Sequence, residues 1–173
     1  MKLNLLLTAL LASLSLNAAT IGEKPATAII EGDNGGLVLD GSAWSSETLK
    51  DKVYVMFYVD PDEKDVNSHY SAALKAQKYR EKGDFQSIAI INLAATWKPN
   101  FVIEKVLKGK QEEFPTTLYV KDKNSVLVNA WDLEDDASNI LIFDKSGKLL
   151  FYKSGKMQED DIKKSFEIIE ANI

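Results

Sequence analysis

The chain has 173 residues, of which 45% are hydrophobic and 27% charged, and its formal net charge is −5. It contains no cysteine, which excludes disulfides, thiolate nucleophiles, dithiol redox pairs and cysteine-ligated metal centres. Its single histidine, His69, makes a histidine-based catalytic triad or a multi-histidine metal site close to excluded.

The first eighteen residues have the layout of a secretory signal peptide. Met1 and Lys2 give a positive start, Leu5–Leu16 is an apolar run of 12 residues, and the small residues Ala18 and Ala19 follow. The run is shorter than the roughly 20 residues that span a bilayer, and no second such run follows. We therefore predict an exported protein without a membrane span, cleaved after Ala18 or Ala19; the alternative is a buried N-terminal helix.

The rest of the chain is mildly acidic and shows no internal repeat or linker. Removal of residues 1–18 takes away one lysine and no acid, so the net charge becomes −6. This balance argues against a nucleic-acid partner, which needs a basic patch, and leaves no polybasic segment for anionic lipids. We expect a single domain over residues 20–173.

The predicted elements begin with two short strands at Ala26–Ile30 and Gly36–Leu39, followed by a loop or one helical turn at Trp44–Lys50. The strongest strand signal is Val53–Val59, seven apolar residues in a row, which indicates burial on both faces. Helical spacing follows from about Glu63 to Lys82, with Asp62 as a plausible N-cap and Gly83 as the stop.

The second half continues the alternation of strands and helices. We expect, in order, a buried strand at Ser87–Leu93, a helix at Asn100–Lys108 between Pro99 and Gly109, strands at Thr116–Val120 and Val126–Trp131, hairpin strands at Asn139–Phe143 and Leu149–Tyr152, and a terminal helix from Gln158. This order predicts an α/β domain with a mixed central sheet covered by helices on both faces.

The order and spacing of several short motifs resemble the YtfJ family of exported bacterial proteins, which is thioredoxin-like but lacks the redox motif. The matching stretches are Gly22–Pro25, Leu39–Gly41, Lys52–Val59, Ile90–Leu93, Glu112–Pro115, and Asp144–Phe151 with Gly155. The resemblance covers essentially the whole mature chain. It implies a thioredoxin-like fold with an N-terminal β extension and a periplasmic location in a Gram-negative bacterium, and it carries no biochemical activity.

Two places in the chain depart from the redox relatives. Where those proteins hold Cys-x-x-Cys after the first long strand, this chain has Asp60–Asp65. Alignment of Asp144 with the strand-end aspartate of the relatives puts Ser138 where they have a cis-proline. Pro115 is the rival for that position, and we favour Ser138.

Seven carboxylates form the first candidate site. They lie in two loops that a thioredoxin fold brings to one end of the sheet, and they are Asp60, Asp62, Glu63, Asp65, Glu134, Asp135 and Asp136. Such a cluster repels itself unless a cation or a basic partner neutralises it, so one hypothesis is that it binds Ca²⁺ or a basic partner surface. The alternative, which we favour, is a solvated acidic rim with no ligand, and we predict no cofactor. Residues 60–71 are not an EF-hand, because Lys64, Asp65 and Ser71 occupy positions that need other residues.

Two further candidates are aromatic or basic side chains. Trp97 precedes Pro99 in a polar loop without apolar periodicity, so we expect it to be exposed, whereas Trp44 and Trp131 are expected to fill the core. Asp65 and His69 are four residues apart on the predicted helix and could pair. Such a pair could orient the imidazole as a base; the alternative, which we favour, is an exposed helix histidine with a local salt bridge.

The sequence thus favours a partner-binding module of the cell envelope that carries out no thiol redox chemistry. We expect a protein or peptide partner at the end of the sheet that holds Asp60–Asp65, Glu134–Asp136, Ser138 and Trp97. Thiol–disulfide oxidoreductase and peroxidase activity are excluded by the absence of cysteine. Two alternatives stay open: a metal-dependent, hydrolase-like enzyme that uses the carboxylates, and a structural role in envelope assembly.

Overall fold

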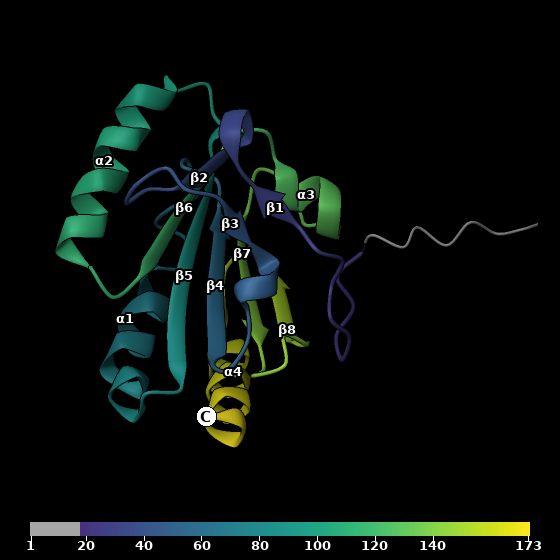
Figure 1. The fold of residues 1–173 in the computed structure, drawn as a ribbon. Helices are drawn as coiled ribbons and strands as arrows, with labels where there is room; N and C mark the ends of the chain where they lie inside the picture. The colour runs from purple at the N-terminus through teal and green to yellow at the C-terminus, as the bar shows by residue number, and fades with distance from the viewer. Residues whose placement is uncertain (1–17) are drawn as a thin grey trace, which may run out of the picture.

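A six-stranded mixed sheet forms the centre of the molecule in the computed structural model, which describes residues 18–173 (Figure 1). The strand order is β2-β6-β5-β4-β7-β8. The strands are β2 (Gly35–Leu37), β4 (Val53–Val59), β5 (Phe85–Asn92), β6 (Leu118–Asp122), β7 (Ser138–Phe143) and β8 (Leu149–Ser154). Except for its last residue, the predicted signal peptide lies outside the described residues.

The direction of the strands determines where a site can form. β4, β5 and β6 run parallel, whereas β7 is antiparallel to β4, and β8 to β7. β4 lies between β5 and β7, which explains its unbroken apolar sequence: Val55 and Met56 point to opposite faces and both are fully buried. The carboxyl ends of β4 and β5 therefore meet the start of β7 at one end of the sheet.

Helices cover both faces of the sheet, as the sequence predicts. α1 (Ser68–Ala76), α2 (Asn100–Glu113) and α4 (Glu159–Asn172) pack on one face, and α3 (Val126–Trp131) on the other. The two crossovers β4-α1-β5 and β5-α2-β6 step in the same direction along the sheet, so the right-handed rule places both helices on the same side. No helix in residues 18–173 is long and apolar enough to cross a membrane.

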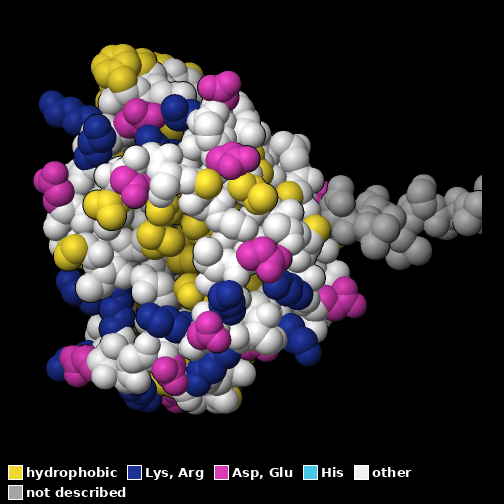
Figure 2. Space-filling model, in the orientation of Figure 1, with side chains coloured by type: hydrophobic (Ala, Val, Ile, Leu, Met, Phe, Trp, Pro, Cys, Tyr) yellow, Lys and Arg dark blue, Asp and Glu magenta, His cyan; other side chains and the backbone are white. Residues whose placement is uncertain are grey.

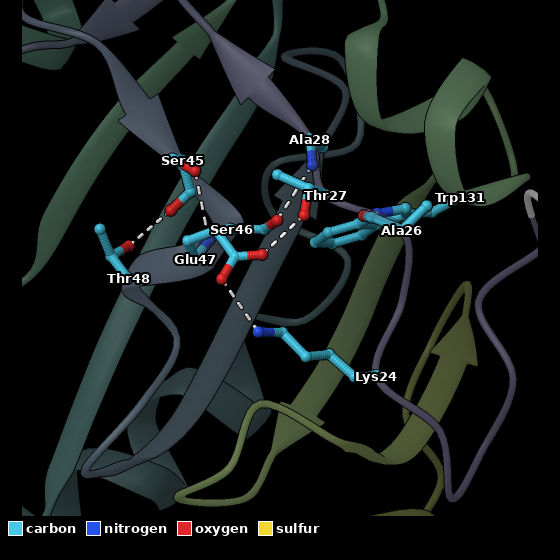
Figure 3. A network of polar contacts seen from close by, with 9 residues as sticks. All are labelled: Lys24, Ala26, Thr27, Ala28, Ser45, Ser46, Glu47, Thr48 and Trp131. Carbon is cyan, nitrogen blue, oxygen red and sulfur yellow. Dashed lines mark hydrogen bonds and ion pairs between the residues drawn. The ribbon is translucent and has the colours of Figure 1, made fainter.

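The N-terminal extension covers the α3 face. β1 (Ile29–Ile30) and β3 (Trp44–Ser45) form a separate two-stranded sheet. Glu47 accepts hydrogen bonds from Thr27 Oγ1 at 2.6 Å and from Lys24 Nζ at 3.1 Å (Figure 3). Trp131 Nε1 donates to the Ala26 carbonyl at 2.7 Å, which ties the extension to α3.

The prediction of a strand at Val126–Trp131 is wrong, because this segment is α3. The β-branched residues favour a strand, but the carboxylate of Asp122 accepts hydrogen bonds from the backbone N–H groups of Val126 (2.9 Å) and Leu127 (3.1 Å). These bonds satisfy donors that the first turn of a helix leaves free. Leu127 and Trp131, four residues apart, are the buried side chains of α3.

The two predicted helices on the other face have different bounds in the structure. α1 begins at Ser68 rather than near Glu63, and Asn67 is its N-cap instead of Asp62. Lys78, in the left-handed conformation, separates α1 from a 3₁₀ turn, η3 (Tyr79–Lys82). α2 continues through Gly109 to Glu113, since a single helical glycine costs only about 1 kcal/mol.

Candidate functional site at the carboxyl end of the parallel strands

Three loops meet at the end of the sheet where β4 and β5 finish. We call this end of the sheet the carboxyl end. The Asp60 N–H, just after β4, donates to the Ala137 carbonyl before β7 at 3.0 Å. The Asp62 carboxylate accepts a hydrogen bond from Thr96 Oγ1 at 2.6 Å and forms an ion pair with Lys98, both in the loop after β5. The structure thus brings together the two acidic loops and the loop that carries Trp97, which the sequence analysis placed at the same end of the sheet.

Asp60 is a buried carboxyl group and not part of a solvated rim. Only 5% of the residue is exposed, and its Oδ1 accepts a hydrogen bond from the Asp62 N–H at 2.8 Å. Burial raises the pKa of Asp60, and the negative charges of Asp62, Asp136 and Glu63 raise it further. The expectation of seven solvated carboxylates is therefore wrong for this residue.

Three more carboxylates have polar or charged partners. Hydrogen bonds from Lys98 and Thr96 hold the pKa of Asp62 below its ordinary value. Asp135 Oδ1 accepts a hydrogen bond from Asn92 Nδ2 at 2.9 Å. Asp65 forms an ion pair with its neighbour Lys64.

The carboxylates do not converge on one point. In the part of the chain that the structure describes, no group of three or more His, Asp or Glu side chains is arranged to hold a metal ion. The interpretation of the acidic loops as a Ca²⁺ site, or as the centre of a metal-dependent enzyme, finds no assembled set of ligands there. Glu134, Asp135 and Asp136 remain an exposed acidic edge.

Ser138 opens β7 directly opposite Val59, the last residue of β4. It is buried, and its Oγ accepts a hydrogen bond from Asn67 Nδ2 at 3.0 Å. Ser138 thus lies beside the loop that replaces the Cys-x-x-Cys of the redox relatives. Pro115 lies before β6, at the opposite end of the sheet, and all peptide bonds in the described residues are trans.

Asn67 holds three segments of the carboxyl end together. Besides Ser138, its side chain contacts the Gly155 carbonyl at 2.9 Å and the Met157 N–H at 2.8 Å. The predicted Asp65–His69 pair does not form, because His69 Nε2 instead contacts the Met157 carbonyl at 2.8 Å. These contacts fix the start of α1 against the segment between β8 and α4.

Trp97 is the most exposed large hydrophobic residue of the described chain, at 87%. Phe101 lies four residues further on, in the first turn of α2, and is 74% exposed. Figure 2 shows hydrophobic side chains gathered at the upper end of α2, where no other part of the molecule covers them. Trp44 and Trp131 are buried, so the sequence-based distinction among the three tryptophans is correct.

The sequence reasoning missed the residues that support this end. The polar side chains of Asn67, Asn92, Thr96 and Lys98 hold the loops, and Phe101 extends the exposed aromatic surface. Phe101 could have been noticed from the sequence, because it follows Trp97 by only four residues and stands in the first turn of α2. The hydrogen-bond partners of Asn67 lie about 70 to 90 residues away in the chain, so local sequence holds no sign of them.

Comparisons with known proteins bear on the whole chain. A family model described as "Bacterial protein of unknown function (YtfJ_HI0045)" matches residues 23–172. A protein of Haemophilus influenzae is 32% identical over 146 residues, which cover 79% of this chain and 78% of that protein. The protein YtfJ of Escherichia coli strain K12 is 24% identical over 146 residues, covering 80% of this chain and 79% of its own length.

Solved structures with low sequence identity share the fold. The thioredoxin domain of a thiol-disulfide oxidoreductase from Bacteroides vulgatus superposes with a TM-score of 0.58 at 14% identity, covering 86% of this chain and 96% of that domain. A thiol-disulfide isomerase from Corynebacterium glutamicum superposes with a TM-score of 0.57 at 18% identity, covering 83% and 94%. The fold is therefore thioredoxin-like, whereas this chain has no cysteine with which to carry out thiol chemistry.

Proposed function

Because this chain belongs to the YtfJ_HI0045 family of bacterial proteins, which has no assigned function to transfer, we propose a function from the geometry of its own carboxyl end. The protein is an exported partner-binding module of the cell envelope, and its binding surface is built from Trp97 and Phe101. The exposure of these two aromatic side chains, four residues apart in the sequence, is the observation that carries the proposal.

The aromatic surface has the features of a binding anchor. Contiguous exposed apolar patches mark interaction sites, and interfaces concentrate their binding energy in a few residues, among which tryptophan is enriched. The loop that carries Trp97 is held in place on both sides of the tryptophan, since Thr96 and Lys98 both bind the Asp62 carboxylate. A loop held in this way loses little conformational freedom when a partner binds.

The charge beside the aromatic surface indicates the chemistry of the partner. Asp65, Glu134 and Asp136 are exposed at the same end, and they create a negative field around the aromatic pair. We propose a protein partner with an apolar cavity for Trp97 and Phe101 and with basic residues around that cavity. Charge complementarity of this kind accelerates association and selects among partners.

The proposal is tested by crosslinking at the surface and by affinity measurements. A photoreactive residue at position 101 in living cells should give one specific adduct, and the adduct's partner is then purified. The double variant Trp97→Ala/Phe101→Ala should weaken binding to that partner at least about tenfold. The matched control is Leu39→Ala, since Leu39 is also 74% exposed but lies on another surface, and its affinity should be unchanged. Equal affinity of the double variant and the native protein would overturn the proposal.

Export is part of the same proposal and has a direct test. In the structure the Ala19 N–H donates to the Trp131 carbonyl at 2.8 Å, and Ala19 packs against the core on the α3 face. Cleavage after Ala18 leaves this contact in place, because the new amino group belongs to Ala19. We expect the mass of the protein from the envelope fraction to correspond to a chain that starts at Ala19 or Thr20, whereas an intact Met1 there would contradict export with cleavage.

A further inference from the structure

A group of cations lies at the opposite end of the sheet, which we call the amino end because β5 and β6 begin there. It includes Arg80, the only arginine of the chain, on the 3₁₀ turn η3 before β5. The Arg80 Nη2 donates to Thr117 Oγ1 at 2.7 Å, in the loop that leads from α2 to β6. This contact joins two segments 37 residues apart in the chain.

Arg80 lacks an acidic partner within the part of the chain that the structure describes. Among residues 18–173, no carboxylate forms an ion pair with its guanidinium, although the group is half-buried. Burial lowers the pKa of Arg80, as expected of a cation that has lost part of its hydration. A guanidinium carries five N–H donors, and Thr117 takes only one contact. Burial of a cation is costly unless an anion compensates it.

Two ammonium groups lie on the neighbouring ring of Phe114. Lys75 Nζ, from the last turn of α1, is 5.4 Å from the ring centre, and Lys110 Nζ, from the last turn of α2, is 5.2 Å from it. Tyr119 lies within the electrostatic reach of both Lys110 and Arg80. Two cations, from α1 and α2, therefore contact the ring of Phe114, and a third, from η3, contacts Thr117 three residues further along the chain.

The acidic groups nearby do not compensate all three cations. Glu113 pairs with Lys110 at 2.8 Å, and Glu81 pairs with Lys78, so each is assigned to a lysine. The dipoles of α1 and α2 stabilise Lys75 and Lys110, which lie in the last turns of these helices. They do not explain why Arg80 has no acidic partner among the described residues. Phe114 also belongs to the Glu112–Pro115 motif, which takes no part in the site at the carboxyl end.

We propose that Arg80, Lys75 and Lys110, with the hydroxyl of Thr117, form a binding site for a phosphate-type oxyanion. The planar guanidinium can bind two oxygens of such an anion at once, the ammonium groups add charge, and Thr117 and Tyr119 supply hydroxyl groups at its edge. The anion is either free in solution or the phosphate of a lipid headgroup, since both present the same oxygens. The site is independent of the partner surface at the carboxyl end.

Calorimetric and NMR titrations of the mature chain test the site, with inorganic phosphate as the probe at constant ionic strength set by chloride. We expect saturable binding, with shifts confined to Lys75, Arg80, Lys110 and their neighbours. Arg80→Gln should lower the affinity at least about tenfold, and Arg80→Lys should restore only part of it, because an ammonium group lacks the two-pronged geometry. The matched control is Lys163→Gln on α4, which removes one exposed cation elsewhere and should leave the affinity unchanged.

A second arm separates the two sources of phosphate. Sedimentation with vesicles of phosphatidylglycerol, against vesicles of phosphatidylcholine, tests a headgroup ligand. Binding of either probe that is lost in Arg80→Gln supports the site, and the probe that binds identifies the source. If Arg80→Gln fails to fold, the exposed pair Lys75→Gln/Lys110→Gln replaces it with the same expectation. Absence of binding to both probes, or equal binding by the variants, would overturn the site.

Discussion

The two ends of the sheet differ in the sign of their charged groups and in whether those groups have partners. At the carboxyl end acids are numerous, yet the structure supplies partners for several of them: Asp62 has Thr96 and Lys98, and Asp135 has Asn92. At the amino end the charge is basic, and Arg80 has no acidic partner among the described residues. A cluster of charges in the sequence is therefore a poor indication of a binding site. A charged group that has no partner of opposite charge in the structure is a better one.

What remains unsatisfied differs in kind between the two ends. At the carboxyl end it is apolar surface, Trp97 and Phe101, which water solvates poorly. At the amino end it is a half-buried cation with free donors. The first suits a protein partner, and the second an oxyanion. Mutations that separate stability from binding at each end test this contrast.

The largest expected effect separates the buried tryptophan from the exposed one. Trp131→Ala removes a side chain that is 1% exposed and the hydrogen bond to the Ala26 carbonyl, so it should cost about 3–5 kcal/mol of unfolding free energy. Trp97→Ala should change the unfolding free energy by less than about 0.5 kcal/mol, because nothing packs over the ring. Urea denaturation of both variants checks the pair, and a large loss in Trp97→Ala would mean that Trp97 is a structural residue and not a binding anchor.

The second effect tests whether the carboxyl end is held by Asn67. Asn67→Ala removes contacts to Ser138, Gly155 and Met157 and leaves buried groups without partners, so we expect a loss of about 2–3 kcal/mol. Ser138→Ala removes only one of these contacts and should cost about 1 kcal/mol. Chemical denaturation gives both values. A similar cost for the two variants would show that the single Ser138 contact accounts for the stabilisation.

Much of this molecule follows from its sequence, and the exceptions have physical causes. The thioredoxin-like fold is what the family resemblance implies. The α/β order of the elements and the exposure of Trp97 follow from local patterns: an unbroken apolar strand, helical spacing, and a tryptophan without apolar neighbours. The helical structure of Val126–Trp131 does not follow from local patterns. Its residues prefer a strand, but the Asp122 carboxylate accepts hydrogen bonds from the first backbone N–H groups of α3 and so stabilises a helix. The burial of Asp60 and the missing partner of Arg80 depend on packing between distant segments.

A smaller and pH-dependent effect is expected at Asp60. Its pKa is raised in the folded state, so the folded protein binds the proton more readily than the unfolded chain does. Stability therefore falls as the pH rises through the window between the ordinary value of 3.8 and the raised one, and at neutral pH the buried charge is unfavourable. Asp60→Asn keeps an acceptor for the Asp62 N–H and should raise the melting temperature at neutral pH.

The gain should shrink as the pH is lowered toward the ordinary pKa of aspartate, where the native carboxyl group is itself protonated. Thermal melts across this range, with Asp65→Asn as the exposed control, measure the difference. A gain in Asp60→Asn that is equal at all pH values would contradict the assignment to the buried charge. Such a result would point instead to better packing of the amide.

Only a small effect on stability is expected of Lys98→Ala. The ion pair with Asp62 is partly exposed on both sides, and such pairs contribute about 0–1 kcal/mol. Loss of Lys98 should nevertheless speed amide hydrogen exchange in the loop at Ala95–Trp97 and weaken partner binding, since Thr96 alone then holds the loop. Phosphate binding at the amino end should be unchanged, just as Arg80→Gln should leave partner binding intact. Because the two sites share no contact, the double variant Lys98→Ala/Arg80→Gln should show both losses without interaction between them, and a measured coupling would mean that the two ends form one connected site.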